Sequence, residues 1–138
     1  MTIDLTDVCI ALSGEGGPLR WFLDVQTGST LLLNAEYDPQ QNNGLTTAQI
    51  EADVARFKRI PAGDANLTLT DMASFAAQTT DAMLKESLEL ALAAPHPERR
   101  FRAVLGWLPE EQARWHAYRQ GQLEIRARTW LKKLGLEP

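Results

Sequence analysis

From Thr70 to the C-terminus, apolar residues recur at helical spacing, and prolines and glycines interrupt the pattern at only a few points. Pro97 and Pro109 each suit the first turn of a helix, because proline fixes φ and lacks the N–H that this turn leaves unpaired. Gly135 suits a helix end. The pattern predicts four helices, over residues 71–78, 81–93, 97–108 and 109–133.

The N-terminal half contains strand signals instead. Two β-rich runs, residues 20–25 and 30–33, flank the turn Gln26-Thr27-Gly28-Ser29 and predict a hairpin. Residues 57–61 predict a short third strand that Pro61 restricts to an edge or a terminus. Two further helices are expected, over 7–13 with Thr6 as its cap and over 48–57 with Thr46 or Thr47 as its cap.

These elements predict an α+β fold, in which a small antiparallel β-hairpin sheet precedes a mostly helical C-terminal part of about four helices. The chain has 138 residues, 44% of them hydrophobic and 23% charged, which is typical of a globular protein. This length suits one domain better than two, so we expect residues 1–138 to form a single domain.

The residues available for metal, redox or membrane chemistry are few. Cys9 is the one cysteine, it lies in an apolar run, and we expect it to be a small buried side chain. His96 and His116 have no partners at ligand spacing, so the sequence predicts no metal and no cofactor. There is no export signal and no run of about 20 apolar residues. We therefore expect a cytoplasmic protein that does not bind a membrane.

Charge is distributed unevenly along the chain. Residues 1–97 carry five Lys and Arg against 13 Asp and Glu, a net −8, whereas residues 98–138 carry nine against five, a net +4. Such polarity suits an anionic partner at one end, or attraction between the two parts of the protein. The second interpretation is favoured slightly.

Arginines and large aromatic residues alternate in two stretches of the basic C-terminal part. In the first stretch, Arg100 and Trp107 form a shallow row beside the apolar stripe of the helix, and Arg99 points away. These residues are candidates for binding a partner. The simpler interpretation, which is favoured, is that the arginines border the core and lay their stems over it.

The second stretch belongs to the last helix. Arg119 and Arg126, seven residues apart, run inside an apolar arc that includes Trp115 and Tyr118. Buried cations without partners are costly. Either Gly121 breaks the helix, or the helix is continuous and the arginines meet carboxylates or an anion. Glycine costs only about 1 kcal/mol inside a helix, so continuity with internal pairing is preferred.

No spacing of catalytic residues is evident, so the sequence favours a non-enzymatic binding or accessory protein. Its candidate binding residues are Arg99, Arg100, Trp107, Trp115, Tyr118, Arg119 and Arg126. Nucleic-acid binding through the basic half is a second hypothesis, because arginine and aromatic side chains suit phosphates and stacked bases. An enzyme of unknown reaction is the third. The acidic net charge of −4 favours a protein partner over nucleic acid.

The order of several short motifs resembles UPF0158, a family of small bacterial proteins of uncharacterised function. The motifs are Leu23-Asp24, Thr27-Gly28, Ile60-Pro61, Met72 with Phe75, Arg99-Arg100-Phe101, Trp115 with Tyr118-Arg119, and Trp130-Leu131. The resemblance implies the fold and a cytosolic location, but no activity. One departure is that His96-Pro97-Glu98 stands where the family has Gly-Ala-Phe.

Overall fold

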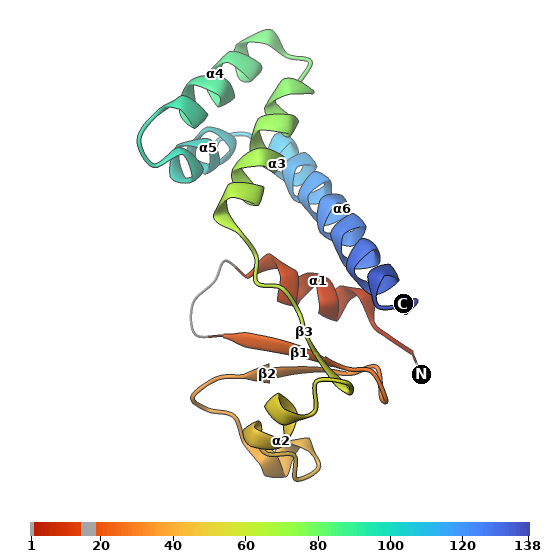
Figure 1. Cartoon of the computed structure of the whole chain (residues 1–138). Coiled ribbons are helices and arrows are strands. Elements are labelled where there is room, and N and C mark those ends of the chain that lie inside the picture. Colours follow the sequence, from red (N-terminus) through yellow and green to blue (C-terminus); the bar gives the residue numbers. More distant parts are fainter. Residues whose placement is uncertain (1, 15–18) are drawn as a thin grey trace. The chain divides into compact units, whose positions relative to one another are not determined.

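The structure is a computed structural model that describes residues 2–14 and 19–138. The chain divides into two compact units (Figure 1). One, the sheet unit, consists of residues 1–63 and 123–138, and the other, the helical unit, consists of residues 64–122. The α+β class is confirmed, with a small antiparallel sheet followed by four helices.

The sheet has three antiparallel strands in the order β2-β1-β3. The strands are β1 (Arg20–Asp24), β2 (Thr30–Leu33) and β3 (Phe57–Arg59). Phe22 lies opposite Leu31 of β2 on one side and opposite Arg59 of β3 on the other. The hairpin is thus confirmed, and so is the short third strand at an edge.

The alternation of side chains along β1 supplies two apolar clusters. Leu23 is fully buried with Val8 of α1 (Leu5–Ser13) and with Leu131, and Trp21 and Val25 pack against the same cluster. Phe22 belongs to a second cluster, whose other buried members are Leu33, Ile50 and Phe57. A strand sends successive side chains to opposite faces, so β1 contributes to both clusters.

Two helix predictions in this unit need correction. The first helix begins at Leu5 rather than Asp7, because Asp4, not Thr6, accepts the hydrogen bond that caps it. The helix expected over 48–57 is only α2 (Thr47–Ala52). Thr46, one of the two predicted caps, forms a capping box with Gln49 at the start of this helix.

The reason for the early end of α2 lies in the residues after it. Asp53 accepts a hydrogen bond from the Arg56 N–H, which closes a turn. The Val25 N–H then donates to the Arg56 carbonyl, so the chain enters β3. Val54 is 71% exposed, and Phe57 is buried as part of the strand rather than of a helix.

The helical unit contains α3 (Ala65–Ala77), α4 (Ala82–Ala93), α5 (Pro97–Leu105) and the first part of α6 (Pro109–Lys133). Asp64 caps α3, which begins six residues earlier than predicted, and Asp81 caps α4. The core of this unit consists of Met72, Phe75, Ala76, Leu84, Leu88, Phe101, Leu105 and Trp115.

Helix α6 is continuous over 25 residues and does not break at Gly121. Its later part lies in the sheet unit, where Leu123, Ala127 and Leu131 join the cluster around Leu23. Cys9 is buried in the same cluster, as expected, with 2% of its surface exposed. Phe101 is fully buried in the helical unit, whereas Trp130 is only partly buried at the cluster around Leu23.

Candidate functional site

Trp115, a candidate binding residue, lies in the core of the helical unit. Its side chain is 3% exposed. The ring centre of Trp115 lies 5.1 Å from that of Phe101 and 5.5 Å from that of Phe75, edge to face in both pairs. Such aromatic pairs add stability beyond the buried area. Trp115 therefore holds α3, α5 and α6 together and presents no binding surface.

The other candidates on α6 are half-buried. The Tyr118 ring packs 5.8 Å from Phe75, at the margin of the same aromatic group. Arg119 and Arg126 lie seven residues apart on one side of a continuous helix, and each takes part in an interaction within the protein. The four candidate residues of α6 therefore do not form a shared binding surface.

A groove between α4 and α5 contains two of the predicted residues, Arg100 and Trp107. It has a volume of about 440 Å³. One side consists of Ser87, Leu90 and Ala91 of α4 and of Ala94 just after it. The other side consists of Arg100, Ala103 and Val104 of α5 and of Trp107 in the turn that follows. The two helices pack against each other (Figure 1), and their outer rows form the walls of the groove.

The groove is apolar and open to solvent. Trp107 is 88% exposed and Leu90 is 65% exposed. Leu108 follows Trp107 in the turn between α5 and α6 and is also exposed. Single exposed apolar residues are common, but a contiguous apolar patch with a large aromatic residue marks an interaction surface. The α4–α5 groove is therefore the candidate functional site.

Two arginines of α5 lie differently relative to this groove. Arg100 lines it, together with Trp107. Arg99 lies instead at a depression on another side of α5, beside Leu69 and Arg102. Arg102 lies 3.6 Å from Glu98 in an i,i+4 ion pair, which partly balances the charge there. The structure therefore brings together Arg100 and Trp107, and it separates both from Arg99.

Sequence reasoning missed the contribution of α4. On this helix Met83 is 80% exposed and Leu90 is 65% exposed, and neither was singled out from the sequence as a binding residue. Residues 83, 87 and 90 fall at i, i+4 and i+7, so they share one face of α4, and Ala94 follows just after the helix. The exposed apolar residues of this row, Met83 and Leu90, were the available signal, in addition to the buried row of Leu84, Leu88 and Ala91.

Comparison with known proteins places the chain in a family. The profile of the uncharacterised protein family UPF0158 matches residues 1–138. The chain belongs to this family. No significant match is found among curated proteins or among solved structures.

The structure explains one motif of the UPF0158 resemblance. In the Leu23-Asp24 and Thr27-Gly28 motif, Gly28 adopts a φ of 82° and its N–H donates to the Asp24 carbonyl at 2.8 Å. A positive φ favours glycine. The motif therefore forms the turn between β1 and β2.

Two further observations concern the kinds of site considered from the sequence. Within residues 2–14 and 19–138, no helix is long and apolar enough to cross a membrane. The same residues contain no group of three or more His, Cys, Asp or Glu side chains that could hold a metal ion.

Proposed function

We propose that this protein is a non-enzymatic binding protein and that the α4–α5 groove receives an amphipathic helix of a protein partner. The observation that carries the proposal is the exposure of Trp107 and Leu90 on the two walls of one apolar groove. Tryptophan and arginine are the residues most often found to dominate binding energy at protein interfaces. Arg100 supplies the second of these types.

The form of the groove suits a helix. The α4 side of the groove runs from Ser87 to Ala94, seven steps of about 1.5 Å, or roughly 10 Å, which equals about two turns of a partner helix. The facing side consists of Arg100, Ala103 and Val104 of α5 and Trp107 in the turn after it, at positions i, i+3, i+4 and i+7. Helices that bind in grooves place apolar residues at the same spacing. Small side chains in the lining, such as Ala91 and Ala103, allow close approach.

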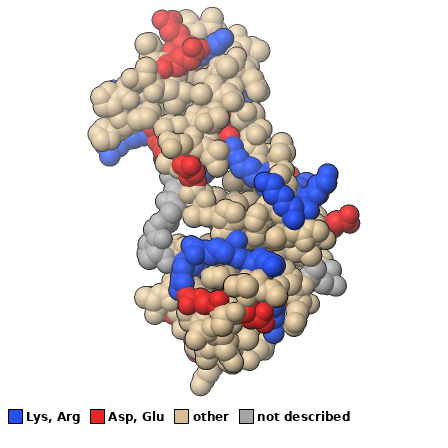
Figure 2. Space-filling model, viewed as in Figure 1, with Lys and Arg blue, Asp and Glu red and all other residues tan. Residues whose placement is uncertain are grey.

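Charge indicates one further property of the partner. Among the lining residues that the structure describes, Arg100 is the charged one. In Figure 2, acidic side chains gather over α4, and much of this face of the helical unit is uncharged. We expect the partner helix to carry apolar residues facing Leu90 and Trp107 and one carboxylate that pairs with Arg100.

A partner can be identified and the contact tested in two steps. Photo-crosslinking from position 107 in cells identifies the protein that covers the groove. A synthetic helix from that protein is then titrated against the purified chain. Trp107→Ala and Leu90→Ala should each weaken binding by at least about tenfold, which corresponds to about 1.4 kcal/mol. Val54→Ala, an equally exposed apolar residue in the sheet unit, is the control and should leave binding unchanged.

The charge pair has its own test. Arg100→Glu should abolish binding, and replacing the partner's carboxylate by lysine should restore it, because the two charges are then exchanged. Binding that is insensitive to Trp107 and Leu90 would refute the proposal. So would crosslinks to nucleic acid, or a dimer of this chain that dissociates on Trp107→Ala, since a second copy would then be the occupant.

A further inference from the structure

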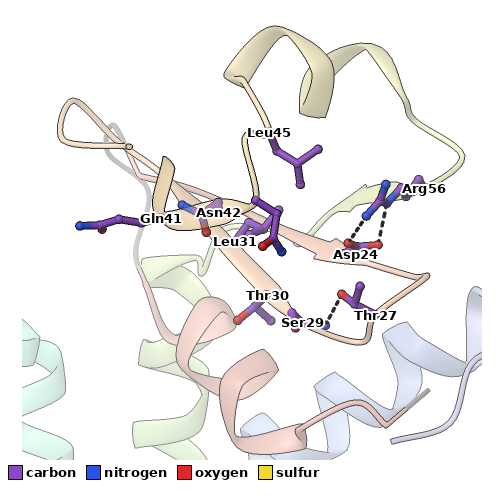
Figure 3. A pocket seen from close by; sticks show the side chains of 10 residues that line it. Asp24, Thr27, Ser29, Thr30, Leu31, Gln41, Asn42, Leu45 and Arg56 are labelled. Atoms are coloured by element: carbon purple, nitrogen blue, oxygen red, sulfur yellow. Dashed lines mark hydrogen bonds and ion pairs between the residues drawn. The ribbon is translucent and has the colours of Figure 1, made fainter. Parts of the chain in front are cut away.

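The sheet unit contains a cavity of about 430 Å³. Its lining is mostly polar, unlike that of the apolar α4–α5 groove. It lies between the β1–β2 turn and the loop before α2 (Figure 3). Its volume is within the range of small-molecule sites. Six of its lining residues carry neutral polar side chains: Thr27, Ser29 and Thr30 on the hairpin, and Gln41, Asn42 and Asn43 on the loop.

A neutralised ion pair forms one wall of this cavity. Asp24 is 3% exposed, and the guanidinium of Arg56 holds it through two hydrogen bonds of 3.0 and 2.9 Å. Both residues line the cavity. Because each charge cancels the other, the wall offers no net attraction for an ionic ligand. Two of the five N–H groups of Arg56 donate to Asp24, and the remaining ones can donate to a bound molecule.

The two sides of the cavity are held by the fold. The β1–β2 turn is closed by the hydrogen bond from the Gln26 N–H to Asp24. On the loop, the 3₁₀ helix η1 (Pro39–Asn42) ends with Asn43 in the left-handed region, at a φ of 57°. The Tyr37 hydroxyl donates to the Leu45 carbonyl at 2.8 Å and fixes the end of this loop. The cavity therefore lies between a turn and a loop that hydrogen bonds hold in place.

We propose that this cavity binds a neutral polyhydroxylated ring of sugar size. Hydroxyl and amide side chains both donate and accept hydrogen bonds, as the hydroxyls of a sugar do. Leu31 and Leu45 provide an apolar wall for the C–H face of such a ring. An anion would need a cation that is not already paired. A planar aromatic ligand would need aromatic walls, and within the described chain no aromatic side chain lines this cavity.

Backbone NMR of the full chain tests this directly. Glucose, ribose and sucrose serve as neutral probes, and glucose 6-phosphate and inorganic phosphate serve as anionic probes. At least one neutral probe should shift the amide resonances of residues 27–31 and 41–45 in a saturable manner. The anions should bind no more tightly than the matched neutral sugar.

A pair of double variants makes the test specific. Ser29→Ala with Gln41→Ala removes two polar groups that line the cavity, and the side chains of both residues are exposed. This variant should weaken binding by roughly tenfold or more. Gln26→Ala with Gln40→Ala is the control, because these exposed neighbours do not line the cavity. It should leave the affinity unchanged, and circular dichroism should show that both variants remain folded.

Three results would overturn the proposal: no shift of the lining resonances with any neutral probe, tighter binding of phosphate than of glucose, or equal effects of the two double variants. None of these results bears on the α4–α5 groove, because Trp107 and Leu90 lie in the other unit.

Discussion

Arg56 donates two parallel hydrogen bonds to Asp24, from Nε to Oδ1 at 3.0 Å and from Nη2 to Oδ2 at 2.9 Å. The pair joins the residue before β3 to the end of β1, 32 positions earlier in the chain. The Asp24 side chain is 5% exposed and that of Arg56 is 27% exposed. The two-pronged geometry makes this pair stronger than an ordinary surface ion pair.

Removal of Arg56 should destabilise the protein. Arg56→Ala leaves the Asp24 carboxylate buried without its charged partner, and we expect a loss of about 2–3 kcal/mol in the free energy of unfolding. Urea denaturation measures this loss. Arg20→Ala is the matched control, because the ion pair of Arg20 with Glu51 is 38% and 42% exposed. It should cost less than about 1 kcal/mol, and equal losses in the two variants would contradict the assignment.

The same pair predicts how stability depends on pH. Burial by itself raises the pKa of the Asp24 carboxyl, but hydrogen bonds from Arg56 and from the Gln26 N–H outweigh burial. The pKa of Asp24 therefore lies below its ordinary value of 3.8. For a carboxyl whose pKa is lower in the folded state, the stabilisation is complete above the unfolded pKa and is lost as the pH falls through the folded pKa.

Urea denaturation of wild type and Asp24→Asn along a pH series provides the measurement. The wild type should lose the contribution of Asp24 as the pH falls below about 4. The variant lacks this titration, so the difference in stability between the two proteins should shrink toward acidic pH. A difference that stays constant over that range would refute the prediction.

Two glycines are expected to respond oppositely to alanine. At Gly63, an added Cβ would lie 2.6 Å from the Leu12 carbonyl oxygen and still closer to that of Gly14, both of which are backbone atoms. Gly63→Ala should therefore destabilise the protein by about 1–3 kcal/mol. At Gly121, inside α6, an added Cβ meets nothing within 4 Å.

Gly121→Ala should then stabilise the protein by about 1 kcal/mol, because alanine is the better helix former. Thermal denaturation of the two variants beside the wild type separates the effects by sign. A lower melting temperature for Gly121→Ala would mean that the helix does not run straight through this residue in solution.

The parts of the fold that were predictable from sequence have local signals. The hairpin follows from strand runs around Gly28, the starts of α5 and α6 follow from Pro97 and Pro109, and the continuity of α6 follows from the low cost of Gly121. The end of α2 was not predictable in this way. Apolar residues at 50, 54 and 57 have helical spacing, but the helix ends at Ala52. The Arg56 N–H donates to Asp53, the Val25 N–H donates to the Arg56 carbonyl, and Phe57 is buried in the strand.

The candidate site was half predictable for a similar reason. Arginine and aromatic content pointed to Arg100 and Trp107, and both line the α4–α5 groove. The same signal also selected Trp115, because sequence spacing on one helix does not show which neighbouring helix covers it. Phe75 and Phe101 cover it here. The α4 side of the groove was missed because Leu90 belongs to an apolar run that is equally expected of a helix buried in the core.

His96 offers a test of backbone strain. It precedes α5 in the left-handed region, at a φ of 55°, and its side chain makes no capping hydrogen bond. For a residue other than glycine this conformation costs about 1–2 kcal/mol. His96→Gly relieves it but adds disorder to the unfolded chain, so a net gain of about 0.5–1 kcal/mol is expected. Denaturant unfolding of His96→Gly measures this gain. The control His116→Gly lies inside α6, where glycine disfavours the helix, so this variant should lose stability.

The two tryptophans of the original arginine-aromatic pattern should separate structure from binding. Trp115 is 3% exposed among Phe75 and Phe101, so Trp115→Ala should cost about 3–5 kcal/mol of stability. Trp107 is 88% exposed, so Trp107→Ala should change stability by no more than about 0.5 kcal/mol. Thermal and urea denaturation of both variants give the comparison. A large loss on Trp107→Ala would show that its ring is packed in solution, and the groove would then lack the exposed aromatic residue on which partner binding is proposed to depend.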